Sequence, residues 1–319
     1  MMNALSKRQF LKLSLASGVA LSLSACGGGD EHDIVDVLSD YPEYSLLVEA
    51  VQAAGLVDTL KGRGPFTVFA PNNVAFGNAL TELGLTKTQL FDNKPLLTAV
   101  LTYHVLAARV PAADIPFGRA ITTVETGIFK IDSAAGGPVI TDERNRESKI
   151  IRTNLFASNG VIHGIDTVIL PGDKDIVDTA LARAPEFSTL VAAVQAAGLE
   201  STLRGAGPFT VFAPTNAAFA SALSTLGIDP TDLLTNPAKR PLLVTILTYH
   251  VVPSRVLKAE VPLNTGITTV EGRDFQVNNG LQIVDALGRT AKIRTTDVLT
   301  SNGVIHVIDN VILPELPPV

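Results

Sequence analysis

The octapeptide GPFTVFAP spans Gly64–Pro71 and returns unchanged at Gly207–Pro214, 143 positions later. The hexapeptide SNGVIH begins at Ser158 and again at Ser301, with the same offset of 143. Repeats of about 20–50 residues build solenoids and propellers, whereas a period this long is a whole domain. The chain is therefore one domain-sized unit written twice. Its 319 residues agree with that, since a domain takes roughly 150 residues.

We expect the first domain to span residues 33–172 and the second to span residues 173–319. The boundary falls near Pro171–Lys174, where the first copy ends and the second has not begun. A linker this short predicts that the two domains are held against each other rather than swinging freely.

Each copy mixes helix and strand signals. Residues 47–54 carry apolar side chains at helical spacing, and Gly55 is placed to end that helix. The alternating residues 65–70 predict a strand, as do three later segments rich in Val, Ile and Thr: 121–124, 161–163 and 168–170. Because helices come early and strands late, the pattern predicts an α+β fold rather than a parallel α/β sheet.

Two pairs of polar residues are candidate helix caps. Asp40 and Glu43 have the spacing of a capping box ahead of the first helix. Asn72 or Asn73 follows the GPFTVFAP strand and can cap the next helix.

The composition excludes several classes of protein. The chain is 46% hydrophobic and 18% charged, with a formal net charge of −6, which describes a globular protein without the basic surface of a nucleic-acid binder. A single cysteine excludes an internal disulfide framework, CxxC redox chemistry and a Cys-rich zinc site.

The first 25 residues read as an export signal. Lys7, Arg8 and Lys12 precede an apolar run over residues 13–25, the order of a signal peptide. The tetrapeptide LSAC ending at Cys26 resembles a bacterial lipobox, so we expect cleavage before Cys26, a lipid on its sulfur, and a tether over residues 26–32. The start also looks like a twin-arginine motif with Lys7 in place of the first arginine, which leaves the export route open.

Three motifs, each present twice in the same order, resemble those of fasciclin-type domains. The first lies at Gly64–Phe76 and Gly207–Phe219 and the last at Ser158–Pro171 and Ser301–Pro314, with a Tyr-His pair between them in each copy. The resemblance implies an α+β fold of two tandem fasciclin-type domains, each a β-wedge or sandwich flanked by helices. It also implies an extracellular module for cell adhesion and matrix contact, from a family that is not enzymatic.

The Tyr-His pairs, Tyr103-His104 and Tyr249-His250, have two interpretations. Neighbouring residues of an extended stretch point to opposite faces, so one ring can pack inward while the other faces out. The apolar surroundings favour a role in the core. The alternative is a surface for protein contact.

The second repeated histidine comes with an aspartate three positions later: His163 with Asp166, and His306 with Asp309. Residues three apart in a strand lie on opposite faces, so one metal ion cannot be shared by both side chains without a bulge. We therefore interpret the motif as structural, with the ring bonded to backbone at a strand end, and predict no metal.

Enzyme signatures are missing: there is no Gly-x-Ser-x-Gly elbow, and the Gly-x-Gly turns precede a strand rather than a helix. We predict no catalysis and no cofactor. The charged run 142–147 is expected to be a solvated loop or hairpin tip, and its counterpart 285–289 is far less charged. This difference marks the place where one domain would contact a specific partner.

Together these features predict an exported protein of the cell envelope, lipid-anchored in the outer membrane, periplasm or cell surface. Its partner would be a protein or an envelope or matrix component, not nucleic acid. One alternative is a carrier for a small apolar ligand, held between strands and helices. A second is a hydrolase with an unrecognised site.

Overall fold

The computed structural model describes residues 32–315. Cys26, the export signal before it and the tether up to residue 31 lie outside the described residues, so the anchor remains a prediction. Across residues 32–315, no helix has both the length and the apolar character needed to span a membrane.

Each copy contains one seven-stranded sheet. In the first copy the strands lie in the order β2-β1-β7-β6-β5-β4-β3, and only the β1–β7 pair is parallel. The strands are β1 (Phe66–Pro71), β2 (Val105–Leu106), β3 (Ala120–Thr122), β4 (Ile128–Ala134), β5 (Gly137–Thr141), β6 (Glu147–Ala157) and β7 (Gly160–Ile165).

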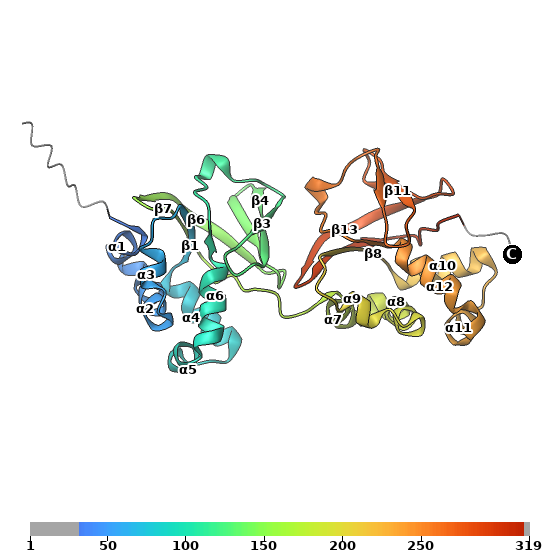
Figure 1. Cartoon of the computed structure of the whole chain (residues 1–319), viewed down its shortest axis with the longest axis horizontal. Coiled ribbons are helices and arrows are strands. Elements are labelled where there is room, and N and C mark those ends of the chain that lie inside the picture. The colour runs from blue at the N-terminus through green and yellow to red at the C-terminus, as the bar shows by residue number, and fades with distance from the viewer. Residues whose placement is uncertain (1–31, 316–319) are drawn as a thin grey trace, which may run out of the picture. The chain divides into compact units, whose positions relative to one another are not determined.

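Helices gather on one side of this sheet (Figure 1). They are α1 (Ile34–Ser39), η1 (Pro42–Tyr44), α2 (Ser45–Ala54), α3 (Val57–Leu60), α4 (Asn73–Leu83), α5 (Lys87–Asp92) and α6 (Lys94–Tyr103). The short helix η2 (Ala112–Asp114) lies apart from them, and its Ala112 packs against the cluster within the sheet. Helix content early and sheet content late confirm the predicted α+β class.

The second copy repeats this topology, with the order β10-β11-β12-β13-β14-β8-β9 and a parallel β8–β14 pair. Its helices are α7 (Ile176–Ala182), α8 (Ala184–Ala197), α9 (Glu200–Leu203), α10 (Asn216–Leu226), α11 (Pro230–Thr235), η3 (Pro237–Lys239), α12 (Arg240–Tyr249) and η4 (Lys258–Glu260). Its strands are β8 (Phe209–Pro214), β9 (Val251–Val252), β10 (Gly266–Thr268), β11 (Asp274–Val277), β12 (Gln282–Val284), β13 (Thr290–Thr300) and β14 (Gly303–Ile308).

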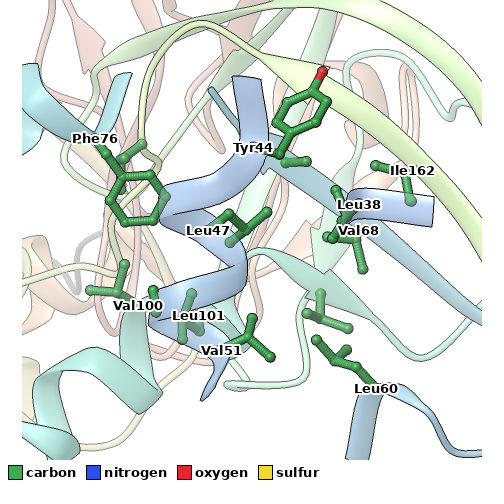
Figure 2. Packing of buried hydrophobic residues seen from close by; sticks show 14 of the residues in the cluster. Leu38, Tyr44, Leu47, Val51, Leu60, Val68, Phe76, Val100, Leu101 and Ile162 are labelled. Atoms are coloured by element: carbon green, nitrogen blue, oxygen red, sulfur yellow. The ribbon is translucent and has the colours of Figure 1, made fainter. Parts of the chain in front are cut away.

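The repeated octapeptide supplies β1 and β8, each the second strand of its sheet beside a two-residue edge strand. Along β1, Val68 and Ala70 pack into the cluster between sheet and helices, while Phe69 points into a second cluster within the sheet. Figure 2 shows the first cluster, in which Leu47 of α2 packs near the β strands. Both faces of β1 are buried, which is why five of its six residues are apolar rather than every second one.

The helix caps follow the sequence in one place and not in the other. Asn72 accepts a hydrogen bond from Ala75 N at 2.8 Å and caps α4, one of the two predicted caps. The predicted Asp40–Glu43 box is wrong, because Asp40 ends α1. The capping box lies at Asp33 and Asp36, seven residues earlier, and begins α1 instead.

The segment 168–170, predicted as a strand, has no strand partner. It is nevertheless fully buried, since Val168 and Leu170 join the cluster beneath the helices and Ile169 joins the cluster within the sheet. An irregular segment that is buried on both sides needs apolar residues at each position, and this gives the same sequence pattern as a core strand.

Candidate functional site

The Tyr-His pair lies at the end of a helix, not in an extended stretch. Tyr103 is the last residue of α6 and His104 is its C-cap, with helical φ and ψ angles of −84° and 0°. Their exposed fractions are 0% and 2%. Both rings therefore lie in the core, as the apolar surroundings favoured. The expectation that one ring faces out is wrong, because a helix end allows both rings to turn inward.

The tyrosine of each pair holds two segments of the sheet together. The Tyr103 hydroxyl donates to Ile128 O and accepts a hydrogen bond from Glu143 N at 3.1 Å. In the second copy, Tyr249 donates to Asp274 O at 2.8 Å and accepts from Ala286 N at 3.2 Å. Burial raises the pKa of Tyr249 to about 12, and it raises that of Tyr103 further. Both hydroxyls thus stay protonated as donors.

The histidine of each pair has both ring nitrogens occupied by main-chain partners. His104 Nδ1 lies 2.7 Å from Val100 O, and its Nε2 accepts from Ile169 N at 3.2 Å. His250 repeats this with Ile246 O at 2.7 Å and Ile312 N at 3.1 Å. A carbonyl on Nδ1 and an N–H on Nε2 fix the neutral tautomer with its proton on Nδ1.

Burial also sets the charge of these rings. Desolvation lowers the pKa of His104 and of His250 from the ordinary 6.5 to about 4. Protonation would put a hydrogen on Nε2, directly facing the N–H of Ile169 or Ile312. The neutral ring therefore links the end of the helix to the segment after the last strand through two hydrogen bonds.

The second repeated histidine lies inside a strand and also bonds to the main chain. His163 Nε2 lies 2.9 Å from Val110 O, and His306 Nε2 lies 2.8 Å from Val256 O. The predicted backbone bond is confirmed, although the ring lies within β7 or β14 rather than at its end. Desolvation lowers the pKa of both rings.

The aspartates of the same motif have a separate task. Asp166 accepts a hydrogen bond from Lys149 N at 2.8 Å, and Asp309 accepts one from Lys292 N at 2.7 Å. Each pins the start of the long neighbouring strand to the end of β7 or β14. Within residues 32–315, no group of three or more His, Cys, Asp or Glu side chains is placed to hold a metal ion.

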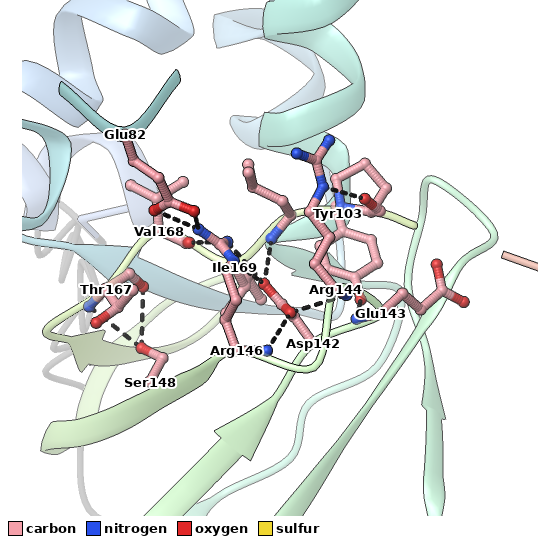
Figure 3. A network of polar contacts seen from close by, with 12 residues as sticks. Glu82, Tyr103, Asp142, Glu143, Arg144, Arg146, Ser148, Thr167, Val168 and Ile169 are labelled. Atoms are coloured by element: carbon pink, nitrogen blue, oxygen red, sulfur yellow. Dashed lines mark hydrogen bonds and ion pairs between the residues drawn. The ribbon is translucent and has the colours of Figure 1, made fainter. Parts of the chain in front are cut away.

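A buried aspartate organises the β5–β6 turn of the first copy. Asp142 is 1% exposed and accepts from Arg144 N, Arg146 N and Leu170 N at 2.9–3.0 Å. Its Oδ2 also receives Arg146 Nη2 at 2.7 Å, while the same guanidinium donates to Val168 O (Figure 3). This clamp joins the turn to the buried segment 168–170.

The second copy has the same clamp. Asp285 accepts from Leu287 N, Arg289 N and Leu313 N at 3.0 Å, and from Arg289 Nη2 at 2.6 Å. Sequence reasoning missed this function. The signal was present, since aspartate and arginine recur four residues apart at the offset of 143 in turns that otherwise differ.

The charged run 142–147 lies at a hairpin tip, one of the two predicted forms, but it is not simply solvated as the sequence predicted. It forms a hairpin turn whose first two acids are buried, because Asp142 serves the clamp and Glu143 bonds to main chain. Glu143 accepts from Ile128 N and Gly172 N, each at 3.0 Å. Burial raises the pKa of Glu143 above its ordinary value.

The same turn contacts the second copy, in agreement with the expectation that the copies are held together. The Asn145 amide donates to Leu299 O at 2.9 Å and accepts from Leu299 N at 2.8 Å. Glu143 lies 3.8 Å from the guanidinium of Arg255. The residues that distinguish this turn from its counterpart 285–289 therefore contact the second copy of the same chain.

Each copy also has a small apolar groove at the same place, between helices and sheet beside the Tyr-His histidine. The walls come from α2, α3, β1 and α6 in the first copy and from their counterparts in the second. Val124 and Val270, 41% and 42% exposed, stand at corresponding positions on the rims. Each cavity measures about 40 Å³, far below the roughly 300 Å³ at which ligand pockets begin.

The repeated motifs and the repeated topology agree with a family model described as "Fasciclin domain", which matches residues 42–171 and 185–314. The chain belongs to the fasciclin domain family.

Relatives in this family come from animals and bacteria. Porcine (Sus scrofa) transforming growth factor-beta-induced protein ig-h3 is 31% identical over 264 residues, covering 80% of this chain and 36% of the relative. Protein sll1483 of Synechocystis is 47% identical over 131 residues, covering 41% and 68%. Human periostin is 29% identical over 268 residues, covering 82% and 30%. The chain thus spans about a third of the length of ig-h3.

Among solved structures, a FAS1 domain pair from the insect cell adhesion molecule fasciclin I is similar to this chain. The match has a TM-score of 0.42 at 17% sequence identity and covers 86% of this chain and 95% of that chain.

Proposed function

We propose that the protein is an exported, membrane-anchored interaction module without catalytic activity, and that it contacts a protein or another component of the cell envelope or matrix. Membership of the fasciclin domain family supports the adhesion class. The observation that carries the proposal is the state of the four motif histidines. Each is buried and bonded to main chain in both copies, so none is free to act as acid, base or ligand.

The Tyr-His pairs would contribute to binding by stabilising the fold, and they would not touch the partner themselves. With Tyr103, His104, Tyr249 and His250 at most 2% exposed, a partner meets the surface that they hold in place. His250→Ala separates the two roles. A large fall in Tm, with binding lost only as the fold is lost, supports the structural role; lost binding at unchanged Tm supports direct contact.

The lipid anchor is proposed on the lipobox alone. Cys26→Ser should move the protein from the membrane pellet to the soluble fraction, because it removes the sulfur that carries the lipid. A variant that stays in the pellet contradicts the anchor without touching the interaction role.

The interaction role itself is tested by capture from the native cell envelope. The mature protein serves as bait, and His250→Ala serves as a destabilised control. Specific retention of one envelope component by the intact chain supports the proposal. Turnover of a substrate panel by the purified protein contradicts it.

A carrier of a small apolar ligand is the second candidate, favoured by the duplicated groove. The cavities of about 40 Å³ would have to open for a ligand of any size to enter. Native mass spectrometry decides the point, because a co-purifying small molecule supports the carrier and a bare mass supports the interaction module.

A further inference from the structure

The two copies meet through different faces, one on each. The first copy contributes what we name the seat, made by Ile128, Lys130, Glu143 and Asn145. The second copy contributes what we name the docking face, made by Arg255, Leu257, Asp297 and Leu299. These residues are joined by the buried cluster of Ile128 with Leu257, Leu299 and Val304.

Polar pairs surround that apolar centre. Lys130 Nζ lies 3.1 Å from Asp297 Oδ2 and 2.9 Å from Asp132 Oδ2, with only 13% of its side chain exposed. Burial by itself would lower the pKa of Lys130, but the two carboxylates outweigh it and raise the pKa. Asn145 adds the reciprocal bonds to the main chain of Leu299. An apolar centre ringed by paired polar groups has the make-up of a specific interface.

Because the copies are duplicates, the first copy carries the matching positions of the docking face, with Pro111 and Asn154 in place of Leu257 and Asp297. Arg109 and Phe156 stand where Arg255 and Leu299 stand in the second copy. Leu299 is 0% exposed, whereas Phe156 is 56% exposed. The Arg109 guanidinium lies over the Phe156 ring, 5.4 Å from its centre, and no ion pair joins Arg109 to any carboxylate of residues 32–315.

The second copy likewise carries a version of the seat, but its anchors are gone. The positions of Ile128, Lys130, Glu143 and Asn145 hold Asp274, Gln276, Ala286 and Gly288. The apolar floor, the cation, the buried carboxylate and the amide are all replaced. Another molecule of this chain therefore has no free seat for the Arg109–Phe156 face: its first-copy seat is covered by its own second copy, and the matching positions of its second copy lack the anchoring groups.

We propose that the Arg109–Phe156 face docks a foreign protein that presents an apolar strand residue beside a carboxylate, the chemistry that Ile128 and Glu143 present to the second copy. Phe156 fills the apolar site and Arg109 pairs with the carboxylate. Arginine and large aromatic side chains are the residues that most often dominate binding energy at protein interfaces. This rests on the proposed interaction role and names the chemistry of its partner.

The test rebuilds the seat within the mature chain itself, by Asp274→Ile, Ala286→Glu and Gly288→Asn together. All three positions are exposed, so the core is untouched. Asparagine suits position 288, since Gly288 has φ of 73° and Asn145 already adopts φ of 59° at the matching place. A face competent for this chemistry must then bind the rebuilt seat of the next molecule, giving head-to-tail assembly.

Sedimentation velocity measures the outcome, with circular dichroism to confirm that each variant is folded. The wild-type chain should stay monomeric at every concentration tested. The rebuilt chain should self-associate with a dissociation constant at least tenfold below the highest concentration at which the wild type is still a monomer. Adding Phe156→Ala or Arg109→Glu to the rebuilt chain should return it to the monomer. Exposed Ile151→Ala on the same strand is the matched control and should not.

Two results overturn the proposal. One is a folded rebuilt chain that remains monomeric up to about 100 μM. The other is a wild-type chain that already associates through Phe156, which would make another molecule of this protein the occupant. Neither outcome depends on the anchor or on capture from the envelope, so failure here is distinguishable from failure of the proposed function.

Discussion

Acidification should destabilise both copies through the histidines of the Tyr-His pairs. Desolvation lowers the folded-state pKa of His104 and His250 from 6.5 to about 4. As the pH falls below 6.5 the unfolded chain takes up a proton at each position, but the folded chain does not until about pH 4. The free energy of unfolding therefore falls across this window and is unaffected by these two groups above it.

The size of the loss follows from linkage. One pKa unit corresponds to about 1.4 kcal/mol, so the full separation is worth about 3 kcal/mol for each ring. Between pH 7.5 and pH 5.5, where carboxylates titrate little, each copy should lose about 1.3 kcal/mol from this histidine. His163 and His306 act in the same direction, because their pKa values are also lowered by burial.

The assay is urea denaturation followed by circular dichroism at half-unit steps of pH. His104→Gln and His250→Gln are the control variants, because glutamine does not titrate and the pH slope of the altered copy should shrink. NMR titration of the folded wild-type chain should find both rings neutral at pH 5.5. A flat stability profile over this window, or ring pKa values near 6.5, would refute the reasoning.

Three further outcomes are expected. Asp142→Asn should cost about 1.5–3 kcal/mol in urea denaturation, since Arg146 loses its buried carboxylate and keeps only the exposed one of Glu82, and a loss below about 0.5 kcal/mol would contradict the clamp. Asn145→Ala should speed proteolysis near Pro171–Lys174 while each copy stays folded; an unchanged cleavage rate would show that its two bonds to Leu299 do not hold the copies together. Asn159→Ala should cost about 2–3 kcal/mol and accelerate hydrogen exchange in α1, because the amide links Ile34 N to Leu60 O and Gly62 O; unchanged exchange in α1 would argue against that link.

Prediction from sequence succeeded where the signal is local. The strand Phe66–Pro71, the cap at Asn72 and the end of α2 at Gly55 each depend on a few neighbouring residues. It placed Tyr103-His104 in the core but failed on their conformation, because an apolar run that ends a helix resembles one that forms a strand. It also failed at Asp142, because only the fold shows that a charged turn is buried against segment 168–170.

The sequence by itself determined that one unit is written twice, that the unit is α+β, and that it belongs to the fasciclin domain family. These follow from repeated local patterns, which survive without any knowledge of distant contacts. Only the tertiary structure decided which side chains are buried and which face is free. Asn145 and Leu299 lie 154 residues apart, and Arg109 and Phe156 lie 47 apart, so their proximity depends on the folded path of the chain.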